Sequence, residues 1–169
     1  GRARFHFSFP GSVQGFRAEG DGGPRLENVA GAGAGGGRAL VLRVDAAAPG
    51  AEVRMVTPTF IPEEAIAMPG YALLASPTLY PRQQLRAHLA APADNAGPLD
   101  VRLLLRVYAA GDVLTAIDGP GARLAPGERT ELGWRIPDTG GAPIAEIGLA
   151  AVATEIGLCA VALDALDWG

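Results

Sequence analysis

Five side chains able to bind a polar ligand lie on the polar faces of two predicted strands. They are Arg86, His88, Arg102, Arg106 and Tyr108. Each alternates with apolar residues in the two-residue period of a half-buried strand, within the segments 83–89 and 101–108. A guanidinium group forms bidentate bonds to carboxylates, phosphates or vicinal hydroxyls, and a tyrosine ring stacks on the apolar face of a sugar. If the two strands are sheet neighbours, the five side chains form one polar platform.

Two strand residues further along the chain, Glu131 and Arg135, would extend this platform. An ordinary solvated sheet face, with each arginine balanced by a nearby carboxylate, explains the same alternation. Both interpretations stay open at the level of the sequence. The alternation places Arg102 and Arg106 on the outward side of their strand. If both point outward, their replacement by alanine should leave folding nearly intact.

Catalysis is not predicted, because the chain lacks a set of residues for it. The sequence contains two histidines, His6 and His88, and its three serines do not lie in a nucleophile motif. The glycine-rich run at 31–37 precedes a strand, whereas a phosphate-binding loop follows a strand and opens a helix. The chain is therefore predicted to bind rather than to catalyse.

Several acidic and amide side chains could together bind a hard cation such as calcium. They are Asp21, Glu27, Asn28, Asp164 and Asp167. Calcium requires six or more oxygen ligands at fixed positions. The same residues are also explained as scattered surface acids and turn residues. This pattern therefore does not require a cofactor.

Composition excludes several classes of partner. The fourteen basic residues are all arginine, and against eighteen carboxylates they leave a net charge of −4, which disfavours binding to duplex nucleic acid. No apolar run approaches the roughly 20 residues of a membrane helix. The single Cys159 excludes an internal disulfide. No signal peptide is visible, the compartment stays undecided, and we expect the chain to be part of a longer protein.

Short strands separated by glycine and proline turns are predicted along the whole chain. The predicted strands are 5–9, 25–29, 39–45, 53–59, 71–75, 83–89, 101–108, 113–117, 130–136, 144–154 and 159–168. A helical turn is predicted at 63–68, and turns at 118–121 and 125–128. The aromatic residues Phe5, Phe7 and Phe9 are expected to face inward, and Trp134 to lie in the core. This pattern predicts one all-β domain over residues 1–169, an antiparallel β-sandwich or jelly roll.

The order of these segments resembles galactose-binding-like jelly rolls, a group that contains many carbohydrate-binding modules. The cues are the aromatic opening strand, the glycine-rich loop before GRALVLRV, and the closing strand LDALDW. More narrowly, ALLASPTLYP, LAPGERTELGWRIPD and PIAEIGL resemble the accessory domain of some actinobacterial ADP-ribosylglycohydrolase-family proteins. This resemblance implies a non-catalytic appendage of a hydrolase whose catalytic domain lies outside this chain.

The resemblance to galactose-binding-like modules implies a structural calcium between an acid of the opening strand and Asp164 of the closing strand. The opening strand offers His6 and Ser8 where an acid would be required.

Three functions remain as hypotheses. The first is a carbohydrate-binding module whose ligand contacts are Arg86, His88, Arg102, Arg106 and Tyr108. The second is an interaction domain that packs on its own catalytic neighbour or forms an oligomer. The third is recognition of an ADP-ribose-like group, with arginines on the diphosphate and Tyr108 or Tyr80 stacked on adenine.

Overall fold

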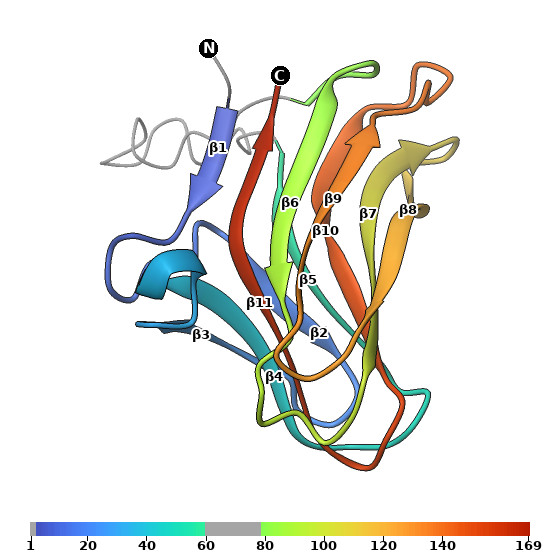
Figure 1. Cartoon of the computed structure of the whole chain (residues 1–169). Coiled ribbons are helices and arrows are strands. Elements are labelled where there is room, and N and C mark those ends of the chain that lie inside the picture. Colours follow the sequence, from blue (N-terminus) through green and yellow to red (C-terminus); the bar gives the residue numbers. More distant parts are fainter. Residues whose placement is uncertain (1–2, 60–78) are drawn as a thin grey trace.

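Two antiparallel β-sheets pack face to face in the computed structural model, which describes residues 3–59 and 79–169 (Figure 1). The first, sheet A, has the strand order β3-β4-β11-β6-β9, and β1 pairs with the last residues of β11. Its strands are β1 (Ala3–His6), β3 (Arg25–Val29), β4 (Ala39–Ala47), β6 (Gln84–Ala90), β9 (Arg129–Arg135) and β11 (Gly157–Trp168). This arrangement confirms the predicted all-β antiparallel sandwich.

The second sheet, sheet B, has the strand order β2-β5-β10-β7-β8. Its strands are β2 (Arg17–Gly20), β5 (Glu52–Pro58), β7 (Leu99–Ala109), β8 (Val113–Leu124) and β10 (Ile144–Ala153). One short 3-10 turn, Ala34–Gly36, lies in the glycine-rich loop between β3 and β4. No helix among the described residues is long and apolar enough to cross a membrane.

The core lies between the sheets and is built from alternate residues of each strand. In β6, Leu85, Ala87 and Leu89 are buried, as their alternation with polar residues predicts. In β7, Leu103 and Leu105 point inward. Burying such a leucine side chain contributes about 1.5–3 kcal/mol, which fixes the phase of each strand. Arg102, Arg106 and Tyr108 are therefore outward, as predicted.

The alanine-rich segments β10 and β11 are strands rather than helices, because each is a central strand paired on both sides. β10 lies between β5 and β7, and β11 lies between β6 on one side and β4 and β1 on the other. Gly148 of β10 has no room for a side chain, since a Cβ there would collide with the backbone of β5 at Met55 and Val56.

The predicted turn at 118–121 is wrong, because these residues continue β8. The pairing of β7 with β8 shifts between Arg102 and Leu104 and then continues to Leu124. Gly119 is packed under an indole ring, as a Cβ there would lie 2.6 Å from Cε3 of Trp134. Trp134 itself is partly buried against the core, in line with its predicted role. The predicted turn at 125–128 is confirmed by a Glu128 N–H bond to the Ala125 carbonyl, at 2.9 Å.

Two further differences concern the first 20 residues. Phe5 and Phe7 are buried, but Phe9 is 69% exposed, because β1 ends at His6 and a turn begins at Phe9, where the Ser12 N–H donates to the Phe9 carbonyl. The strand β2 was not predicted from the sequence. The helical turn predicted at 63–68 and the strand predicted at 71–75 lie outside the described residues.

Candidate functional site

The single polar platform predicted from β6 and β7 does not form. These two strands follow each other in the chain but belong to different sheets. Arg86 and His88 lie on the outer face of sheet A, whereas Arg102, Arg106 and Tyr108 lie on the outer face of sheet B, with the core between them. Two separate polar faces replace the predicted one.

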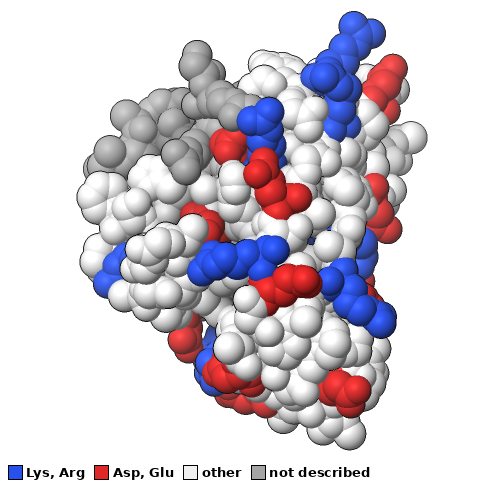
Figure 2. Space-filling model, viewed as in Figure 1, with Lys and Arg blue, Asp and Glu red and all other residues white. Residues whose placement is uncertain are grey.

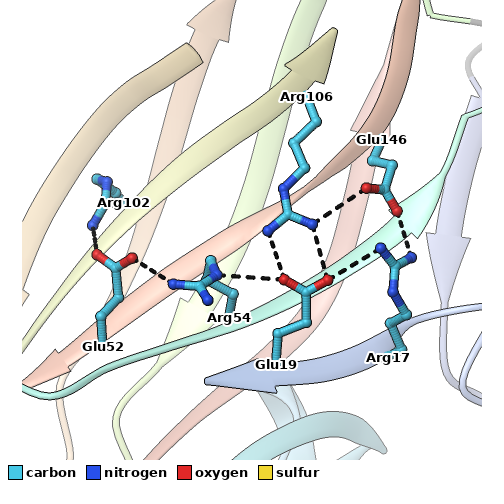
Figure 3. A network of polar contacts seen from close by, with 7 residues as sticks. All are labelled: Arg17, Glu19, Glu52, Arg54, Arg102, Arg106 and Glu146. Carbon is cyan, nitrogen blue, oxygen red and sulfur yellow. Dashed lines mark hydrogen bonds and ion pairs between the residues drawn. The ribbon is translucent and has the colours of Figure 1, made fainter. Parts of the chain in front are cut away.

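On sheet B, seven charged side chains form a continuous network, which we call the sheet B network (Figure 3). Its members are Arg17, Glu19, Glu52, Arg54, Arg102, Arg106 and Glu146. They come from four strands, β2, β5, β7 and β10, whose outward residues share one face.

Arg106 is the centre of this network. Its Nη2 donates to Oε1 of Glu19 at 2.6 Å and its Nη1 to Oε2 of the same carboxylate at 2.9 Å. The same Nη1 donates to Oε1 of Glu146 at 3.3 Å. Arg17 contacts both of these carboxylates from the other side. Only 16% of the Arg106 side chain and 9% of the Glu146 side chain are exposed, so these charges are held largely away from water.

A second group continues the network across β5. Glu52 accepts from Nη1 of Arg102 at 2.6 Å and from Nη1 of Arg54 at 2.7 Å. Arg54 also contacts Glu19 at 3.4 Å, which joins the two groups. Arg102 donates in addition to Asp118 of β8 at 2.9 Å. Positive and negative groups therefore alternate across the sheet.

The ion pairs fix the charge of the carboxylates. The hydrogen bonds from Arg106 lower the pKa of Glu19 from 4.5 to about 2, against the opposing effect of burial. The hydrogen bond from Arg102 likewise lowers the pKa of Glu52. Arg102 and Arg106 have raised pKa values, chiefly because of their bonds to Glu52 and Glu19. Glu19, Glu52, Arg102 and Arg106 are therefore ionised near neutral pH.

Three small or apolar residues lie beneath these charges on the same outer face. Val56, Leu104 and Ala150 form an apolar cluster separate from the main core, and each is no more than 1% exposed. Leu104 stands between Arg102 and Arg106 in the alternation of β7. Arginine side chains carry apolar stems that can cover such a surface while their guanidinium groups stay polar. A small buried apolar cluster therefore lies on the same outer face as the network.

Tyr108 extends this face beyond Arg106. Its side chain is 38% exposed, and its backbone N–H donates to the Pro143 carbonyl at 3.0 Å. It borders an open hollow of about 650 Å³, formed mainly by residues 109–112 and 139–143. Tyr108, Arg106 and Glu146, with the adjoining hollow, are called the sheet B site below.

Arg86 and His88 have looser surroundings on sheet A. Arg86 Nε lies 4.0 Å from Glu131 Oε1. His88 lies between two carboxylates, with 3.6 Å from Nε2 to Asp167 Oδ2 and 3.9 Å from Nδ1 to Glu131 Oε2. These distances are too long for hydrogen bonds. Glu131 does lie beside His88, as predicted for the extension of the platform, because β9 pairs with β6.

Asp164 has partners that do not fit a calcium ligand. Its carboxylate accepts from the Ala34 N–H at 2.9 and 3.0 Å and from Nη1 of Arg129 at 3.2 Å. These are hydrogen-bond donors, one of them cationic, whereas calcium is surrounded by oxygen ligands. No group of three or more His, Cys, Asp or Glu side chains that could hold a metal ion occurs within 3–59 and 79–169.

Charge is mixed over the surface as well. On the face shown in Figure 2, acidic and basic side chains lie beside each other, and neither sign forms a continuous field.

Sequence reasoning missed five members of the sheet B network. They are Arg17, Glu19, Glu52, Arg54 and Glu146. A signal was present, because Arg17-Ala-Glu19 and Glu52-Val-Arg54 place opposite charges two residues apart, on one face of a strand. Glu146 is also the one charged residue in the otherwise apolar or small segment of β10.

No protein-family model matches this sequence, and the search of curated proteins gave no match. Solved structures do match. One comes from work on the promiscuous specificity of carbohydrate-binding modules of the β-sandwich superfamily, with a TM-score of 0.68, 13% identity, and coverage of 94% of this chain and 58% of that chain. A second is the family 22 module of a Clostridium thermocellum endo-1,4-β-D-xylanase, joined to its catalytic module, with a TM-score of 0.66, 11% identity, and coverage of 98% and 28%.

A third is a xylan-binding domain from Paenibacillus barcinonensis, with a TM-score of 0.66, 12% identity, and coverage of 98% of this chain and 91% of that one. The chain therefore has the β-sandwich fold of these modules, and it spans 58% and 28% of the first two matched chains. The comparisons do not support the narrower resemblance to the accessory domain of ADP-ribosylglycohydrolase-family proteins.

Proposed function

We propose that this chain is a non-catalytic carbohydrate-binding module that binds a glycan on the outer face of sheet B. The observation that carries the proposal is the sheet B site, where the exposed Tyr108 borders an open hollow and a row of ordered charged groups lies next to it on the same face. The fold shared with modules described as carbohydrate-binding and xylan-binding supports it.

The chemistry of the site suits a neutral sugar chain. Carboxylate oxygens accept hydrogen bonds from sugar hydroxyls, guanidinium groups donate to them, and the tyrosine ring offers a stacking surface. The ion pairs already hold these groups in place, so binding would order few further side chains. The network with Asp118 contains four arginines and four carboxylates, so its formal charges cancel and an anionic ligand gains no advantage there.

The direct test is calorimetric titration with xylohexaose and with neutral mannan and glucan oligosaccharides of equal length. We expect one of these to bind, and Tyr108→Ala to weaken that binding about tenfold, since an aromatic contact contributes on the order of 1 kcal/mol beyond its buried area. Tyr108→Phe keeps the ring and should bind like the wild type. Equal binding by wild type and Tyr108→Ala would contradict the proposed site.

No binding across the whole panel would instead favour the interaction-domain hypothesis, in which this face is covered by protein. An ADP-ribose-like ligand would be indicated by binding of ADP-ribose that Tyr108→Ala abolishes and added salt weakens. We further propose that the module belongs to a longer hydrolase. This context is supported by the matched xylanase, which carries its sandwich module beside a catalytic module.

A further inference from the structure

A row of four side chains crosses the outer face of sheet A. Pairing aligns His6 of β1 with Ala165 of β11, Ala165 with His88 of β6, and His88 with Glu131 of β9. The chain contains two histidines in all, and both lie in this row on either side of Ala165. Because alanine is small, the space between the two imidazoles is not filled by the strand that separates them.

The space forms a hollow of about 280 Å³, which we call the sheet A hollow. Its lining includes His6, Ser8, Arg38, His88 and Asp164. The pairing of β11 with β6 shifts between Leu163 and Ala165, and this irregularity brings Asp164 to the same face as Ala165. A second depression of about 230 Å³ adjoins it and shares Ala34, His88 and Asp164.

One wall of the hollow is anchored by a set of hydrogen bonds. The Ala34 N–H is held by the Asp164 carboxylate, and Arg129 donates both to that carboxylate and to the Ala32 carbonyl. The loop lies so close that a Cβ at Gly33 would be 2.6 Å from Oδ1 of Asp164. The glycine-rich loop is thus fixed against β11.

Charge in the hollow is not balanced. The Asp164 carboxylate is already engaged by Arg129 and by a backbone N–H. Arg38, by contrast, donates to the carbonyl oxygen and to Oδ1 of Asn28, at 3.5 and 3.2 Å, and has no ion pair with a carboxylate in the described ranges. Asn28 in turn donates to the carbonyls of 7, 9 and 12, so Arg38 is attached to an ordered segment.

We propose that the sheet A hollow binds the carboxylate of an acidic sugar, such as a uronic acid unit of a glycan. Arg38 supplies the cation, and His6 adds a ring nitrogen on the same side. Glu131 and Asp167 face His88 from β9 and β11, so the anion lies toward Arg38 and His6, while His88 and Asp164 bond to neutral hydroxyls. The proposal rests on the glycan-binding function proposed above and adds a second site on the opposite face.

The test uses the two histidines as reporters. Nitrogen-edited NMR of the imidazoles gives one set of signals for each, and both should move during titration with glucuronic acid. Glucose, which has the same ring without the carboxylate, should move them little, and acetate should bind more weakly than glucuronic acid. Arg38→Gln should weaken glucuronic acid binding about tenfold, the effect of removing a hydrogen bond to a charged group.

Ala165→Val provides a second variant, because it narrows the hollow between the two imidazoles and leaves Arg38 and Asn28 themselves unchanged. It should also abolish the imidazole shifts. Arg135→Gln is the matched control, since Arg135 lies on the neighbouring strand β9, outside the lining of the hollow, and donates to the Arg82 carbonyl. It should bind like the wild type.

The two proposals fail separately. Unchanged imidazole signals with glucuronic acid, or equal shifts with glucose, would overturn the acidic-sugar site even if neutral oligosaccharides bind at Tyr108. Loss of neutral binding in Arg38→Gln or Ala165→Val would also contradict it, because the hollow is separated from the sheet B site by the core.

Discussion

Two arginines of this sandwich, Arg106 on sheet B and Arg38 beside sheet A, differ in how their charges are neutralised. On sheet B, Arg106 contacts two carboxylates and only 16% of its side chain is exposed. Beside sheet A, immediately before β4, Arg38 borders a hollow and donates its side-chain hydrogen bonds to neutral oxygens. The same residue type, arginine, therefore has a neutralised charge in one place and an unpaired charge in the other. Mutual pairing produces a rigid and electrically neutral surface, whereas an arginine without a carboxylate partner keeps its charge for a ligand.

The largest effect should come from removing the centre of the sheet B network. Arg106→Ala leaves Glu19 and Glu146 with fewer cationic partners in a half-buried site, so we expect the free energy of unfolding to fall by about 3 kcal/mol. Urea unfolding of the wild type and the variant measures this change in the free energy of unfolding. Arg123→Ala removes the exposed pair with Asp100 and should cause no measurable change. Equal stability of the two variants would show that the network contributes no more than a surface ion pair.

This expectation revises the prediction made from the sequence. Alternation alone implies that an outward arginine is replaced without loss of folding. Arg106 is indeed outward, but its carboxylate partners and its burial make it costly to remove.

A smaller effect should appear as a pH dependence of stability. Because Arg106 lowers the pKa of Glu19 to about 2, the ionised carboxylate stabilises the folded state above its ordinary pKa of 4.5. This contribution should be lost as the pH falls from about 5 toward 2, and Glu19→Gln should reduce the slope over that range. Arg106→Met should reduce it similarly, since the cause of the shift is removed. A slope unchanged in both variants would contradict the assignment.

Ligand affinity should depend on salt concentration at the sheet A hollow but not at the sheet B site. We expect glucuronic acid binding at the sheet A hollow to weaken several-fold between about 0.05 and 0.5 M NaCl, because added ions screen Arg38 from the carboxylate. Neutral oligosaccharide binding at Tyr108 should change little over the same range. Parallel titrations by calorimetry and NMR test this. Salt sensitivity of the neutral ligand alone would reverse our assignment of ligand classes to faces.

A small effect should follow the loss of Arg86. Its Nε is 4.0 Å from Glu131 and both side chains are largely exposed, so Arg86→Ala should change the free energy of unfolding by no more than about 0.5 kcal/mol. Thermal and urea unfolding measure this change. A loss approaching that of Arg106→Ala would mean that sheet A carries an ion-pair network comparable to that of sheet B.

Much of the fold follows from the sequence, because the apolar alternation that buries a strand is local. The segments of β4, β6, β7 and β9 and the inward phase of Leu85 and Leu103 are examples. The missed β2 has four residues and is only partly buried, so it carries little apolar signal. The turn predicted at 118–121 is wrong because a local glycine signal was present but had another cause. Gly119 makes room for the Trp134 ring within β8, and the chain does not change direction there.

The sequence by itself determined the fold class, the outward direction of Arg102, Arg106 and Tyr108, and the chemical types of the side chains available for binding. Only the tertiary structure decided which of them meet. Strand order placed β6 and β7 in different sheets, joined Arg106 to Glu19, and aligned His6 with His88 through Ala165. The physical reason is that alternation depends on neighbours two residues apart, whereas pairing across a sheet joins distant residues, 77 positions apart for His88 and Ala165 and 159 positions apart for His6 and Ala165.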